Sequence, residues 1–217
     1  MIANSQEVQS RIRKFYNREA PIIYPPVEIL ETEKNKFKKR EKPYFLMVGR
    51  IVAYKNMDII VKAFKNIPTT LVIVGSGNEE NKLRELAASN VEFLGRAGDE
   101  EKHFLMEHSL GLINPVIDED FGIVPVESML HGRPVLAHKS GGHLETIDEN
   151  VNGMFFESLS IEDIEKKIRE FENNIIANKY DPERIKSFAQ KYSKKRFQEE
   201  LKSFVEEKWK EHVEKNA

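Results

Sequence analysis

The stretch Tyr44–Val74, "YFLMVGRIVAYKNMDIIVKAFKNIPTTLVIV", decides the fold class of this chain. It begins and ends with short, continuous apolar runs, Tyr44–Val48 and Thr70–Val74. An amphipathic segment at Asn56–Lys65 lies between them. Continuous apolar runs are typical of strands buried on both faces, and a helix between two such strands allows parallel pairing. The stretch therefore predicts a β–α–β unit.

The same alternation continues through most of the chain. It predicts a single doubly wound, Rossmann-like α/β domain, in which helices cover both faces of a parallel six-stranded sheet. Further strands are expected at Val91–Leu94, Leu110–Asn114, Pro134–His138 and Gly153–Phe156, and further helices at Glu79–Ser89, Asp99–His108 and Val124–His131.

The two ends of the chain differ from this pattern. A helix is expected at Ser5–Phe15, with Ser5 as its cap and Val8, Ile12 and Phe15 on one face. Helices are also expected at Ser160–Phe171 (capped by Ser160), Asp181–Gln190 and Ser193–Val213. The predicted division is an N-terminal helix and linker at 1–42, an α/β domain at 43–172 and C-terminal helices at 173–217.

Composition narrows the function classes. The chain has 217 residues, a net charge of −2 and no cysteine, which excludes disulfides and gives no bulk attraction to nucleic acid. Its first residues, "MIANSQEVQS", lack the features of a signal peptide, so a cytoplasmic protein is predicted. The basic run is read as a solvated, mixed-charge linker rather than a phosphate site; it comprises Lys36, Lys38, Lys39 and Arg40 beside Glu31, Glu33 and Glu41.

Ligands of open parallel sheets bind at the carboxyl ends of the strands. Arg50 and Lys55 follow the first strand, where they are suited to clamp a diphosphate; two solvated side chains are the alternative. The turn "VGSGN" has Gly75 and Gly77 but lacks the third glycine of a dinucleotide fingerprint. A tight turn into a helix is the plainer interpretation.

The segment "DEDFGIVPVESMLHGRPV" at Asp118–Val135 carries two glutamates across a helix start. Pro125 fits only the first turn, so the helix is expected to begin near Ile123 or Val124. Its N-terminus attracts phosphate, while Glu119 and Glu127 are acceptors for hydroxyl groups. A nucleotide sugar carries both the phosphates and the hydroxyls.

With these features the chain resembles the donor-binding half of the retaining GT-B glycosyltransferases that carry an E-x7-E signature (glycosyltransferase family four). Glu119 and Glu127 have that spacing, and blocks similar to the family's occur in the same order. The blocks are "VGRIVAYKNMDIIVKAF", "LVIVGSGNEENKLRELA", "NVEFLGRAGDEEK" and "EDFGIVPVESMLHGRPVLAHKSGGHLETI". The forms "IRKFYNREAPIIYPPVEI" and "EDFGIVPVE" are similar to mannosyltransferases of polysaccharide synthesis, with GDP-mannose as the implied donor.

The resemblance implies a role for each matching residue. Arg50 and Lys55 would stabilise the leaving diphosphate, Glu119 would face the donor sugar, and these three form the catalytic set. No metal ion or other cofactor is implied. The implied donor-binding set is Gly49, Gly75, Ala97, Asp99, Lys102, Phe121, Gly122, Ile123 and Glu127, with Glu127 on the ribose and Ala97, Asp99 and Lys102 near the base.

The resemblance also implies an acceptor-binding domain before residue 1, since "MIANS" resembles the end of such a domain. That domain would take a saccharide or lipid-linked acceptor, and through it the protein would lie peripherally at the inner membrane face. The apolar stripe Phe197, Leu201, Phe204, Val205 and Trp209 would pack on it or mediate self-association. Two readings stay open: part of a working sugar transferase, and a nucleotide-sugar-binding module without activity of its own.

Overall fold

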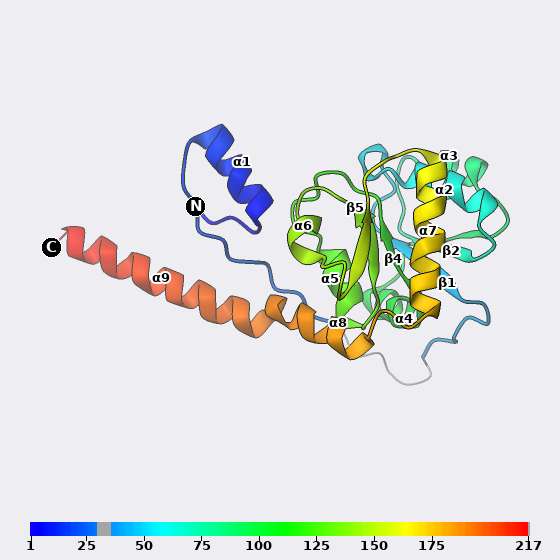
Figure 1. Ribbon diagram of the computed structural model, residues 1–217. Coiled ribbons are helices and arrows are strands. Elements are labelled where there is room, and N and C mark those ends of the chain that lie inside the picture. Colours follow the sequence, from blue (N-terminus) through cyan, green and yellow to red (C-terminus); the bar gives the residue numbers. More distant parts are fainter. Residues whose placement is uncertain (30–35, 217) are drawn as a thin grey trace.

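A six-stranded, parallel sheet forms the centre of the computed structural model, which describes residues 1–29 and 36–216 (Figure 1). The predicted fold class is confirmed. The strands lie in the order β3 (Val91–Gly95), β2 (Thr70–Val74), β1 (Tyr44–Val48), β4 (Gly111–Asn114), β5 (Val135–His138) and β6 (Gly153–Phe156). Glu31 and Glu33 of the predicted linker lie outside the described residues.

The strand order reverses between β1 and β4. The chain runs outward from β1 to β2 and β3, then returns to place β4 on the other side of β1. The loops that follow β1 and β4 therefore leave the sheet towards opposite faces, which opens a crevice at their carboxyl ends. The loops that carry Lys55 and Glu119 are these two.

Helices form a layer on each face of the sheet. One layer holds α2 (Met57–Ala63), α3 (Glu80–Leu86) and α7 (Ile161–Ile176); the other holds α4 (Asp99–His108), α5 (Ile123–Leu130) and α8 (Pro182–Ala189). The short helix α6 (His143–Thr146) follows β5.

The third helix ends earlier than the sequence predicts, at Leu86 instead of Ser89. Ala87 is extended, with ψ of 142°. The side-chain amide of Asn90 donates to backbone carbonyls in the segment just before β2. The residues before β3 are therefore held by a side-chain anchor and not by helical hydrogen bonds.

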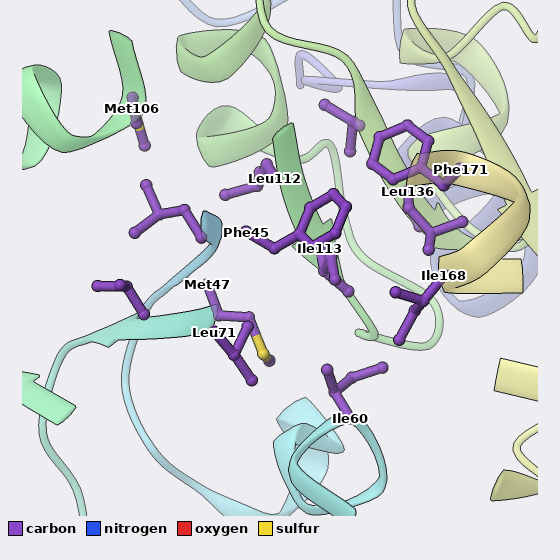
Figure 2. Packing of buried hydrophobic residues seen from close by; sticks show 14 of the residues in the cluster. Phe45, Met47, Ile60, Leu71, Met106, Leu112, Ile113, Leu136, Ile168 and Phe171 are labelled. Carbon is purple, nitrogen blue, oxygen red and sulfur yellow. The ribbon is translucent and has the colours of Figure 1, made fainter. Parts of the chain in front are cut away.

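The core around β1 and β4 consists mostly of aliphatic side chains, among which Phe45 and Phe171 lie (Figure 2). The ring centroid of Phe45 lies 5.7 Å from that of Phe171 and 6.3 Å from that of Phe64. On β4, a Cβ at Gly111 would lie only 3.1 Å from the Phe171 ring, so glycine allows this close packing. Each such buried side chain stabilises the fold by about 1.5–3 kcal/mol, which gives the crevice loops a rigid base.

The first helix, α1 (Gln6–Tyr16), forms as predicted. The Ser5 hydroxyl accepts a hydrogen bond from Val8 N at 3.0 Å, and Ile12 is buried. The expectation for Phe15 is wrong, because its side chain is 71% exposed. The apolar partners of α1 are small and few, chiefly Ala3 and Ala20, and they cover only the Ile12 side of the helix.

The C-terminal helices behave in two ways. α8 packs on α5, and Ile185, Ala189 and Tyr192 belong to the main core, so this part of the segment 173–217 is continuous with the sheet domain. The boundary placed after residue 172 falls inside α7. By contrast, α9 (Lys194–Asn216) buries none of its residues and extends away from the sheet (Figure 1). Its apolar stripe is open, and Trp209 is 67% exposed.

Candidate functional site

Glycines allow the loops that follow β1 and β2 to pack closely against each other at the crevice. A Cβ at Gly75 would lie 1.8 Å from Gly49 O, and one at Gly77 would lie 2.0 Å from Ile51 O. Gly75 also has a φ of +141°. At Gly75 and Gly77, glycine thus allows one loop to approach the other closely. A direct contact of Gly49 or Gly75 with a ligand stays a prediction.

The loop that carries Glu119 is held from behind by the turn after β5. Gly142 N donates to Glu119 O at 2.6 Å, and Asp118 N donates to Ser140 Oγ at 2.8 Å. A Cβ at Gly141 would lie 2.5 Å from Glu119 O. Asp118 has a φ of +52°, an uncommon conformation for a residue other than glycine. The turn with Gly141 and Gly142 therefore fixes the position of Glu119.

The helix after this loop begins where Pro125 predicts. Gly122, with a φ of +92°, precedes the first residue of α5, Ile123, and no side chain caps the helix. The ring of Phe121 is buried against Tyr24 and Tyr192, so this residue can offer a ligand only its backbone. The backbone N–H groups of the first turn are left for an anion.

The reversal of strand order brings a cation and a carboxylate together. Lys55 Nζ lies 3.6 Å from Glu119 Oε2, and both side chains are largely shielded from solvent. Arg50 stands further out, where its Nη2 donates to the Tyr54 hydroxyl at 3.2 Å. The structure thus joins Lys55 and Glu119 directly, while Arg50 shares the β1 loop without contacting either.

A second ion pair lies one turn into α5. Lys102 Nζ is 2.9 Å from Glu127 Oε1 and 3.3 Å from Asp99 Oδ1. Burial raises the pKa of Glu127, and the hydrogen bond from Lys102 opposes that rise. Burial lowers the pKa of Lys102, but hydrogen bonds and charges from Glu127 and Asp99 outweigh it and leave that pKa raised. Ala97 lies nearby in sequence and is half-buried.

The other oxygen of Glu127 is the exception in this arrangement. Glu127 Oε2 is buried and has no hydrogen-bond partner among the described residues. A buried acceptor without a donor costs about 1–3 kcal/mol. A ligand with hydroxyl groups would supply the missing donor.

Two side chains beneath the crevice were not predicted from the sequence. His143 is fully buried, with Nδ1 2.9 Å from His138 O and Nε2 3.2 Å from the Asn114 amide. Burial lowers the pKa of His143, which favours the neutral ring. A neutral ring that donates to the carbonyl and accepts from Asn114 satisfies both contacts. In the sequence, the only indication of this side chain was that a histidine directly follows "SGG".

A pair of histidines lies behind Lys102. His103 Nδ1 is 2.9 Å from His131 Nε2, so one ring donates and the other accepts. Burial, followed by the charge of His103, lowers the pKa of His131 to about 4. Burial and the charge of Lys102 also lower the pKa of His103, and Asp99 opposes this. The pKa of His131 is lowered further by the charges of three other groups, Arg133, Lys186 and His108.

This pair predicts a loss of stability in acid. The unfolded histidine binds its proton near pH 6.5 and folded His131 near pH 4, so its contribution is full above 6.5 and declines as the pH falls towards 4. Between pH 7 and 4.5 the loss is about 2 kcal/mol. Urea denaturation should show a smaller loss for His131→Asn than for the wild type or His212→Asn. Equal losses in all three would refute the assignment.

The fold and its charged crevice define the class of the protein. The structure superposes on an Anabaena protein solved with UDP and glucose, with a TM-score of 0.78, 22% identity and coverage of 94% of this chain and 62% of that one. The chain thus has the α/β fold of a GT-B glycosyltransferase domain.

The family follows from the sequence comparison. The chain belongs to the glycosyl transferases group 1, whose family model matches residues 29–192. An uncharacterized glycosyltransferase of Methanocaldococcus jannaschii is 30% identical over 199 residues, or 89% of this chain and 55% of the relative. A GDP-mannose-dependent mannosyltransferase of Mycobacterium tuberculosis, acting on a phosphatidylinositol monomannoside, is 29% identical over 156 residues, or 63% and 40%. The chain therefore spans about half the length of these relatives.

Over residues 1–29 and 36–216, none of the helices combines the length and the apolar character needed to cross a bilayer.

Proposed function

We propose that the chain is the donor-binding half of a retaining glycosyltransferase of the E-x7-E group, family four. In this proposal it binds a nucleoside-diphosphate sugar in the crevice between the β1 and β4 loops. The observation that carries the proposal is the unpaired, buried oxygen of Glu127, one helical turn behind the Lys55–Glu119 pair. Lys55 and the helix N–H groups, with Glu119 before the helix and Glu127 one turn into it, match a diphosphate flanked by a sugar and a ribose.

Each charged group then has a place along the donor. Lys55 and Arg50 hold the diphosphate and stabilise its charge as the bond to the sugar breaks, so that no metal ion is needed. Glu119 faces the sugar, and the backbone of Phe121, Gly122 and Ile123 contacts sugar and phosphate. Glu127 accepts from the ribose hydroxyls, with Ala97, Asp99 and Lys102 towards the base.

We further propose GDP-mannose as the donor and a saccharide or lipid-linked molecule in polysaccharide synthesis as the acceptor. The GDP-mannose-dependent relative from Mycobacterium tuberculosis supports the donor. UDP in the Anabaena structure makes uridine nucleotides the comparison to test. Because the chain spans about half of its relatives, transfer would require an acceptor domain, and a nucleotide-sugar-binding module is the second candidate.

Titration calorimetry tests the diphosphate site. Lys55→Ala should weaken binding of GDP and GDP-mannose about tenfold or more, the loss of about 1.4 kcal/mol expected for one charged hydrogen bond. Lys62→Ala is the matched control, because Lys62 lies on α2 and pairs with Asp58 at 2.8 Å. Equal losses for the two variants, or no binding of GDP, UDP or their sugars to the wild type, would contradict the proposal.

A further inference from the structure

Helix α1 is attached to the edge of the crevice by its N-terminus. The carboxylate of Glu145, on α6, accepts hydrogen bonds from Gln6 N at 2.9 Å and 3.0 Å. A negative charge at this end also complements the helix dipole. The Tyr192 hydroxyl donates to Glu145 O at 2.9 Å, which ties α6 to the core below. Figure 1 shows α1 on the side of the sheet domain where α6 lies.

One turn further along α1, Arg11 reaches the loop that carries Glu119. Its Nη1 lies 2.5 Å from Asp120 Oδ1, and its Nη2 donates to Asp118 O at 2.8 Å. The third nitrogen, Nε, donates to Glu7 Oε1 at 2.9 Å, which orients the guanidinium from within the helix. One planar group is therefore bonded to the residues on both sides of Glu119.

This arrangement differs from an ordinary surface ion pair, which contributes only about 0–1 kcal/mol. The rigid fork of arginine contacts a side chain and a backbone carbonyl together, which fixes orientation as well as distance. The backbone at Asp118 is in the left-handed region, so the loop needs outside contacts to keep its shape. Ser140 and Gly142 hold it from one side, and Arg11 holds it from the other.

We propose that Arg11 is a positioning residue for Glu119, and that Glu145 docks α1 so that Arg11 can reach the loop. Its effect on the donor rests on the proposed function. The restraint of the loop by Arg11 does not rest on the proposed function, because it follows from the contacts of Arg11 alone. In this view α1 takes part in the donor site through the loop between Asp118 and Gly122 without touching the donor.

Hydrogen exchange in the intact chain tests the hold without any ligand. The reporters are the amides of Asp118 and Gly142, which are bonded to Ser140 Oγ and Glu119 O. Arg11→Ala should speed their exchange about tenfold, while Arg18→Ala, at an exposed arginine beyond the helix, should leave it unchanged. Glu145→Gln should speed exchange in the first turn of α1 more than in the loop. Loop exchange in Arg11→Ala equal to that of the wild type would overturn the proposal.

Calorimetry with GDP-mannose supplies the second readout. Arg11→Ala should weaken its binding about fivefold, and the charge exchange Arg11→Asp with Asp120→Arg should restore part of the loss. Unchanged binding in Arg11→Ala would overturn the effect on the donor. If the wild type binds no nucleotide sugar but Arg11→Ala still loosens the loop, the hold is supported and the proposed function fails.

Discussion

Replacing Lys102 with alanine is expected to destabilise the chain by about 3 kcal/mol at pH 7.5, because it leaves the carboxylate of Glu127 buried without its cation. The side chain of Glu127 is only 11% exposed, and one of its oxygens already lacks a partner. Truncation would remove the partner of the other oxygen as well. By comparison, Lys62→Ala breaks a half-buried i,i+4 pair and should cost less than about 0.5 kcal/mol.

The pH dependence of this variant identifies the cause. Burial raises the pKa of Glu127 in the folded state, and Lys102 restrains that rise. Without Lys102 the folded pKa rises further. A carboxyl group whose pKa is raised by folding costs no stability below its unfolded pKa of 4.5. The free energy of unfolding falls as the pH rises from that value through the folded pKa. The deficit measured by urea denaturation should therefore shrink from pH 7.5 to pH 5.

A double variant separates charge from packing. Lys102→Met with Glu127→Gln keeps much of the volume and removes both charges, so it should recover more than half of the stability lost in Lys102→Ala. A Lys102→Ala deficit that is constant with pH, or no recovery in the double variant, would mean that the ion pair is not the source of the effect.

Gly75→Ala is expected to cost more than about 3 kcal/mol or to prevent folding, because its Cβ would lie 1.8 Å from Gly49 O. The obstacle is backbone and cannot rotate away. Gly95→Ala is the matched control: it also has positive φ, at +72°, but its Cβ would meet nothing within 4 Å. That control should show only conformational strain, about 1–2 kcal/mol.

Thermal unfolding distinguishes the two effects. The midpoint should fall far more for Gly75→Ala than for Gly95→Ala, while Gly98→Ala, with negative φ and open space, should change little. If Gly75→Ala and Gly95→Ala melt together, the contact between the β1 and β2 loops is not as close as described, and the shape of the crevice would need revision.

The sequence predicted those parts of the fold that depend on local chemistry. Apolar runs located every strand to within a residue, and Pro125 located the start of α5. Because ligands of parallel sheets bind at the carboxyl ends of the strands, Lys55 and Glu119 were both expected at the crevice, but the strand order that brings their loops together was not predicted. These features are local or follow from general rules of topology.

Features set by distant contacts were not predictable in this way. Arg11 meets Asp120 across 109 positions of sequence, and nothing in the α1 pattern indicates that contact. The exposure of Phe15 was missed because helical periodicity gives a face but not what covers it. The glycines showed that something approaches closely, yet the sequence alone did not distinguish a ligand from another loop.

A crystal structure of the chain with GDP-mannose bound tests the central claim most directly. The account predicts the diphosphate between Lys55 and the N-terminus of α5, and ribose hydroxyls about 2.6–3.2 Å from the carboxylate of Glu127. It also predicts that Lys55 and Glu119, whose side chains lie 3.6 Å apart in this structure, turn towards phosphate and sugar respectively. A nucleotide bound elsewhere, or bound with Glu127 still lacking a donor, would contradict the account.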